Sequence, residues 1–234
     1  MSSARYDFMR GKDEVNAYIK FLDIVENGNI NLTNSTGVVA FTINTELSRT
    51  LKANAFLLLY NLIESTLRNG LFDVHDAIKS ERVDYKDLES KFKKLLLDEQ
   101  LRKKFEFGTR TESVTNIVYD IVDKIMSQPA FMYPDKRSTV KFIGGNLDID
   151  HIHETFKLYG ITAVSVRHTD QKEAFETTKR NRNNLAHGNE TFNECGKKYS
   201  SPQLIGFRDE IFDYLERVLD EIERFTDNKK YMVV

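Results

Sequence analysis

The stretch RNRNNLAHG, residues 180–188, combines the side chain types that phosphate chemistry requires. Arg182 and His187 are five positions apart, which on an ideal helix is about 140° around the axis and ~7.5 Å along it. A guanidinium can hold a phosphate through two parallel hydrogen bonds. An imidazole can carry the proton of an attacking hydroxyl or of a departing oxygen.

The reaction that fits this pair is transesterification of RNA. The guanidinium would stabilise the charge that gathers on the phosphate in the transition state, and the imidazole would move the protons. The nucleophile would be the 2′-hydroxyl, so DNA could bind but could not be cut by this route. The mechanism requires neither a metal ion nor a cofactor.

The spacing alone does not select one pair. Arg68 with His75, in RNGLFDVH, and Arg180 with His187 satisfy the same loose rule, as short motifs often do by chance. The stretch is equally typical of a helix C-terminus that Gly188 ends, where His187 caps free carbonyls and cations complement the macrodipole.

A second set of polar side chains lies within an otherwise apolar helix predicted over residues 45–79. Four of them share one face: Asn54, Asn61, Glu64 and Arg68. They indicate either a solvated seam with a Glu64–Arg68 ion pair or the lining of a polar cleft. The remaining faces are apolar, which predicts a position in the middle of a bundle.

The composition favours helices. The chain has 234 residues, 40% of them hydrophobic and 30% charged, with only three prolines and eleven glycines. Such a chain can bury a core, and the few turn residues argue against an all-β architecture. A net charge of −2 excludes a global basic field, so any phosphate-binding surface must be local.

The periodicity predicts an all-α, antiparallel up-and-down bundle with extra helices and a small hairpin near residues 30–43. The predicted helices span residues 12–26, 45–79 (with a possible break near Gly70), 84–106, 112–127, 148–159, from Thr169 or Asp170 to Gly188, and 202–226. Asp170 followed by Glu173 indicates a capping box. In the fourth helix the spacing predicts four inward residues: Val114, Ile117, Ile121 and Ile125. Pro129, Pro134 and Gly144-Gly145 predict an irregular connection.

Other chemically active residues give weaker signals. DIDHIHE, residues 148–154, contains two histidines, but they are two positions apart, whereas paired helical metal ligands lie three or four apart. We therefore expect a capped helix start there and no metal. Cys195 is predicted to be a packed or surface thiol, and His75 and His168 are assigned structural roles.

RNNLAHG resembles the signature of the HEPN superfamily, an arginine followed by a polar residue, a spacer and a histidine. LLLYNLIESTLRNGL, GGNLDIDHIHETFKLYG and NETFNECGKKYS are similar to a branch of HEPN-like proteins described as nucleases. The resemblance implies one HEPN-like domain over residues 1–234, with residues 84–140 as a less distinctive helical insertion. It also implies a homodimer in which two copies of the motif line one cleft.

The resemblance further implies a metal-independent endoribonuclease of toxin or phage-defence type. Arg182 and His187 would be catalytic, Asn183 and Glu64 would support them, and Arg180 and Lys179 would contact RNA. Toxins of this superfamily that are silenced by adenylylation carry a tyrosine two positions past the histidine. Asn189 stands there instead, so that form of regulation is not expected.

Two other functions stay open: a HEPN-like dimer that binds a nucleotide or a protein without turnover, and a helical scaffold in a larger defence complex. An antitoxin or defence-system protein is an expected partner. The single cysteine and the charged start MSSARYDFMRGKDEV indicate the cytoplasm, and no apolar run approaches the ~20 residues of a membrane span.

Overall fold

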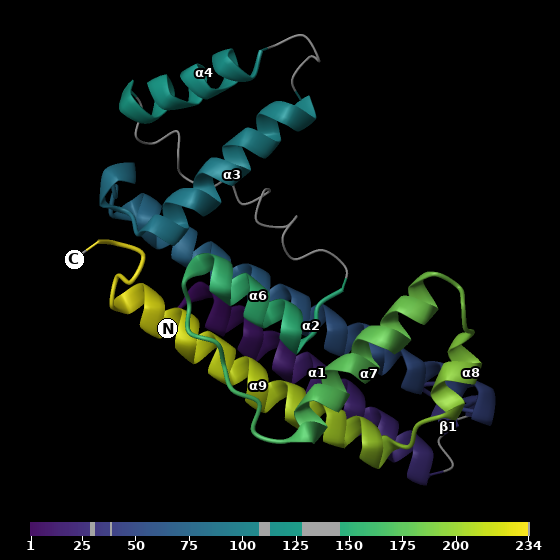
Figure 1. Cartoon of the computed structure of the whole chain (residues 1–234). Coiled ribbons are helices and arrows are strands. Elements are labelled where there is room, and N and C mark those ends of the chain that lie inside the picture. The colour runs from purple at the N-terminus through teal and green to yellow at the C-terminus, as the bar shows by residue number, and fades with distance from the viewer. Residues whose placement is uncertain (29–30, 38, 108–112, 128–145, 234) are drawn as a thin grey trace.

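The structure, a computed structural model, is a bundle of helices, as the sequence predicted (Figure 1). It describes residues 1–28, 31–37, 39–107, 113–127 and 146–233. The elements within these ranges are α1 (Ser3–Asn27), β1 (Asn31–Thr33), β2 (Val39–Thr42), α2 (Thr45–Ser80), the 3₁₀ turn η1 (Tyr85–Asp87), α3 (Ser90–Phe107), α4 (Val114–Ser127), α6 (Ile149–Tyr159), α7 (Thr169–Ala186), α8 (Phe192–Lys197) and α9 (Ser201–Asp227). The antiparallel pair β1–β2 is the predicted hairpin.

Helix α2 is the centre of the bundle, because it packs against α1, α7, α8 and α9. Most of its apolar residues are buried, among them Phe56, Leu59, Ile63 and Leu67. The predicted break near Gly70 is absent, and the helix is continuous from Thr45 to Ser80. A Cβ at Gly70 would lie 2.6 Å from Ile222 Cδ1, so the glycine lets α9 approach closely.

Helix α1 begins nine residues earlier than the periodicity predicted. The Ser2 side chain caps it by accepting a hydrogen bond from the Arg5 backbone N–H at 3.1 Å. The Arg5 guanidinium binds Glu223 on α9, and the Phe8 ring packs edge-on against Phe212 with centroids 6.3 Å apart. This first part of α1 is therefore fixed by contacts with α9, which periodicity within the segment does not reveal.

The segment after α2 also departs from the prediction. Residues 84–106 were expected to form one helix, but η1 precedes a separate start of α3 at Ser90. On α4, Ile117 and Ile121 are buried as predicted, whereas Val114 is 63% exposed and was wrongly placed inward. Figure 1 shows α3 and α4 projecting away from the other helices. The connection predicted at Pro129, Pro134 and Gly144-Gly145 lies outside the described residues.

Helix α7 carries the RNRNNLAHG stretch. It begins at Thr169, one of the two predicted starts, but its N-cap is His168, whose side chain makes no capping hydrogen bond. The capping box inferred from Asp170 and Glu173 is therefore wrong. The short helix α8 was not predicted, because six residues are too few to show a helical period.

None of the helices in the described ranges combines the length and the apolarity that crossing a membrane requires.

Candidate functional site

The end of α7 exposes a histidine at a fixed position. His187 is the C-cap, with φ −94° and ψ 0°, and Gly188 follows with φ +69°. The Gly188 N–H donates to the Leu185 carbonyl at 3.3 Å and the Asn189 N–H donates to the Asn184 carbonyl at 2.9 Å. These are the two bonds of a Schellman motif, for which glycine is favoured in the left-handed conformation.

The His187 side chain is exposed, and its ring makes no hydrogen bond or ion pair to any residue that the structure describes. The carbonyls of the last turn are met by backbone N–H groups in the Schellman motif. The imidazole is therefore not used as the carbonyl cap that the helix-end interpretation allowed, and it remains accessible to a ligand.

Arg182, five residues before His187 on α7, is held by an aromatic ring of α2. Its guanidinium carbon lies 4.4 Å from the centre of the Tyr60 ring on α2. Tyr60 is fully buried, and its hydroxyl accepts a hydrogen bond from the Leu147 backbone N–H at 3.0 Å. A cation over an aromatic face is attracted by the ring quadrupole, and here the ring cannot turn away because both its ends are fixed.

A chain of amides fixes the same arginine from the side. Arg182 Nη1 donates to Asn183 Oδ1 at 2.9 Å, and Asn183 Nδ2 donates to Asn146 Oδ1 at 3.0 Å. Asn146 lies shortly before α6. Asn183 thus lies against Arg182 and connects it to a segment far away in the sequence.

Lys179 is paired with Asp148, the N-cap of α6. Burial alone would raise the pKa of Asp148, but hydrogen bonds from Lys179 and from the His151 N–H outweigh it and lower the pKa. The ion pair joins α7 to the start of α6. The charge of Lys179 is therefore already offset in part, while Arg180 is exposed and contacts Thr177 Oγ1 at 3.4 Å.

The polar stripe of α2 divides into two parts. Asn54 bonds to the Thr50 carbonyl of its own helix at 3.1 Å. Glu64 and Arg68 form the predicted ion pair at 3.2 Å, and with Asn61 they line a groove of about 350 Å³ between α1 and α2. Both interpretations of the stripe therefore hold in part, since the ion pair itself lines a groove.

Burial of Tyr60 raises its pKa, and the negative charge of Glu64 acts in the same direction, while Arg182 and Lys179 act against them. The phenol is therefore neutral near pH 7. Glu64 is close enough to Tyr60 for its charge to be felt there, which connects the α2 groove electrostatically to the ring under Arg182.

The rival pair of Arg68 and His75 is not available for catalysis. His75 is 3% exposed and stacks on Tyr159, with ring centroids 5.5 Å apart, and Arg68 is paired with Glu64. Both histidines of DIDHIHE make structural contacts. The His151 backbone N–H donates to the cap Asp148, and the His153 ring lies 2.8 Å from the Val164 carbonyl oxygen. Cys195 is packed in the interior, and burial raises its pKa to about 11.

The residues that the sequence did not reveal are Tyr60, Asn146 and Asp148. All three come from elements that meet α7 only in the folded protein. YNLIE around Tyr60 showed an apolar helix face, and a buried tyrosine below a cationic helix is not visible in such a pattern.

An exposed histidine and an arginine fixed on a buried ring thus lie near the end of one helix of a bundle. The sequence matches the HEPN_MAE_28990-like HEPN family over residues 3–231, and the chain belongs to that family. No curated protein and no solved structure matches this sequence.

Proposed function

We propose that this protein is a metal-independent endoribonuclease, with Arg182 and His187 as its catalytic pair. One observation carries the proposal: the guanidinium is fixed on Tyr60 and Asn183 while the imidazole at the end of the same helix is exposed and unengaged within the described residues. A charge that is positioned before substrate arrives costs no reorganisation in the transition state. We also propose that residues 1–234 form one domain.

The reaction is attack of the 2′-oxygen on the adjacent phosphorus. The imidazole of His187 accepts the 2′-hydroxyl proton, the P–O5′ bond breaks, and the products are a 2′,3′-cyclic phosphate and a 5′-hydroxyl end. Arg182 holds the non-bridging oxygens, where negative charge increases. Asn183 orients the guanidinium, and Arg180 and Lys179 contact flanking phosphates.

Two proton transfers must occur, one from the 2′-oxygen and one to the departing 5′-oxygen. A single motif supplies one imidazole, so we propose a homodimer in which the second His187 serves as the acid. Light scattering at micromolar concentration would show twice the mass of the chain. A monomer that cleaves RNA at full rate would disprove the composite site.

The decisive experiment incubates the purified chain with a mixed RNA pool in excess EDTA. Cleavage with cyclic phosphate ends is expected for the wild type. His187→Ala should reduce it by about 10²–10⁴-fold, the usual contribution of a general acid or base. Arg180→Ala removes an arginine of the same helix that contacts only a flanking phosphate, so it should reduce cleavage far less than His187→Ala. DNA of the same sequence should stay intact.

A binding module without turnover is the second candidate, and the groove lined by Asn61, Glu64 and Arg68 favours it. In that case RNA or a nucleotide binds, His187→Ala leaves binding unchanged, and no RNA is cut. An antitoxin or another defence-system protein would then act by covering the same surface. Uncut RNA in the EDTA experiment, together with saturable binding, would select this function.

A further inference from the structure

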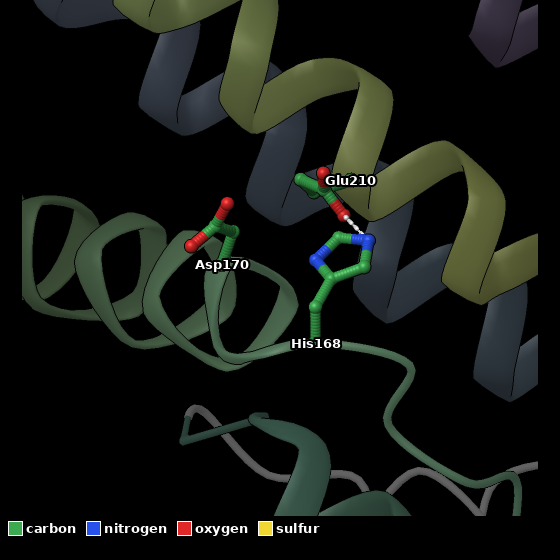
Figure 2. A group of neighbouring side chains, drawn as sticks. All are labelled: His168, Asp170 and Glu210. Atoms are coloured by element: carbon green, nitrogen blue, oxygen red, sulfur yellow. Dashed lines mark ion pairs between the residues drawn. The ribbon is translucent and has the colours of Figure 1, made fainter.

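Three ionisable side chains outside the candidate nuclease site meet where α7 begins. His168 and Asp170 stand at the start of α7, and Glu210 comes from α9. Figure 2 shows the imidazole of His168 directed at Glu210, with Asp170 beside it on the first turn of α7. His168 was assigned a structural role from its sequence alone. Its contact with Glu210, 42 positions later in the chain, depends on how α7 packs against α9.

The geometry suits a small divalent cation. One potential ligand atom from each residue lies within 4.8 Å of the others, and His168 Nε2 is 3.3 Å from a Glu210 carboxylate oxygen. Zinc binds nitrogen and carboxylate oxygen at ~2.0–2.2 Å, which places neighbouring ligands of a tetrahedral site about 3.3 Å apart. The third ligand, Asp170, is exposed and can close the remaining gap by rotation of its side chain.

The charges also leave room for a cation. Within the described residues, no lysine or arginine forms an ion pair with Asp170 or Glu210. The neighbouring Arg167 is directed to Asp213 at 2.6 Å, a carboxylate that it shares with Arg217. The His168 side chain makes no capping bond to its own helix, which leaves the ring to interact with α9.

We propose that His168, Asp170 and Glu210 form a zinc site that ties the N-terminus of α7 to α9. An imidazole nitrogen together with two carboxylates favours zinc over magnesium, which prefers six oxygen ligands and retains its water. The side chains of His168 and Glu210 are 47% and 25% exposed, so the ion can enter and water can complete its coordination. The site has a structural role and takes no part in RNA cleavage.

This site is separate from the candidate nuclease site. Helix α7 has 18 residues, so its two ends are about 27 Å apart at 1.5 Å per residue. Zinc at one end therefore cannot touch a phosphate held at the other. The consequence is that EDTA removes the stabilisation by zinc and leaves metal-independent cleavage unaffected.

The test is a titration of the full chain with Zn²⁺ after EDTA treatment and dialysis, measured by calorimetry and by thermal unfolding. We expect one zinc per chain with micromolar affinity and a higher Tm, because a ligand that binds only the folded state stabilises it. Excess Mg²⁺ should give no shift. The zinc-edge X-ray absorption spectrum should show one imidazole with oxygen ligands and no sulfur.

Single substitutions locate the site. His168→Ala, Asp170→Asn and Glu210→Gln should each weaken zinc binding at least tenfold. His187→Ala is the matched control, since it removes another exposed imidazole from the same helix and should leave zinc binding unchanged. The proposal is overturned if the chain binds no zinc below millimolar concentration, if His168→Ala binds it as tightly as the wild type, or if His187→Ala abolishes binding.

Discussion

The two ends of α7 each present a histidine at a cap position, and the neighbouring helices place different groups near each of them. At the N-terminus, α9 contributes Glu210, so His168 faces carboxylates. At the C-terminus, α2 contributes Tyr60, which holds a cation, Arg182, five residues before His187. In the two proposals, the surroundings of an imidazole, and not its place on a helix, decide whether it binds a cation or a phosphate.

The helix dipole acts on the two ends in opposite ways. The positive N-terminal end favours the carboxylate of Asp170 in the first turn. The negative C-terminal end favours a positive charge. The direction of the helix therefore favours acidic side chains where α7 begins and cationic side chains where it ends.

The strongest test of this comparison makes one substitution at each end of α7 and compares their effects on RNA cleavage. Arg182→Ala should reduce RNA cleavage about 10³-fold, because it removes the charge-assisted contacts to the phosphate in the transition state. Glu210→Gln should leave cleavage within a factor of two, because it alters only the opposite end. Single-turnover rates with excess enzyme measure both. Equal losses in the two variants would show that the ends are not independent.

A smaller effect is expected from the ring beneath Arg182. Tyr60→Leu removes the aromatic face and should lower the cleavage rate about fivefold, in line with a cation–π interaction of ~1 kcal/mol. Tyr60→Phe retains the face and should cleave nearly normally. Because the leucine also leaves a cavity that costs about 2–4 kcal/mol of stability, circular dichroism must first establish that the variant is folded at the assay temperature. A phenylalanine variant as impaired as the leucine variant would assign the effect to the hydroxyl.

The amide chain should contribute less. Asn146→Ala removes the acceptor of Asn183 Nδ2 and leaves the bond between Asn183 and Arg182 in place. We expect a reduction in cleavage of about threefold, consistent with ~0.5–1 kcal/mol for one exposed hydrogen bond. Asn184→Ala, on the same turn of α7, is the control. No change in the Asn146 variant would mean that Asn183 orients the arginine without support from this segment.

The sequence predicted those parts of the fold and the site that depend on neighbouring residues. The seam of α9 and the end of α7 at Gly188 follow from local period and from the conformational freedom of glycine, and both were found. The early start of α1 and the division of η1 from α3 depend on distant contacts, such as Arg5 with Glu223, and were missed.

The same distinction between local patterns and distant contacts applies to the candidate site. Arg182, Asn183 and His187 could be proposed as site residues because the motif is continuous in the sequence. Tyr60 and Asn146 could not be identified, since they reach Arg182 only when α2 and the segment before α6 pack against α7. The extent of the domain and the insertion at residues 84–140 stay predictions.

The smallest expected effect concerns the pair that joins α7 to α6. Asp148→Asn keeps a capping side chain at the start of α6 but loses the charge that Lys179 binds, so it should cost a few tenths to about 1 kcal/mol near pH 7. The folded protein holds the pKa of Asp148 below its ordinary value of 3.8. Its contribution to stability is thus complete well above pH 3.8 and is lost as the pH falls through the lower, folded value.

Urea unfolding of the wild type and the Asp148→Asn variant between pH 7 and pH 3 measures this contribution directly. The difference in midpoint should narrow as the pH falls below about 4.5 and should nearly vanish in stronger acid. Asp150→Asn is the control, because the pair of Asp150 with Lys172 is exposed and should give no measurable difference at any pH. A difference in midpoint that widens as the pH falls would contradict this, because it would mean that the ionised carboxylate of Asp148 destabilises the folded state.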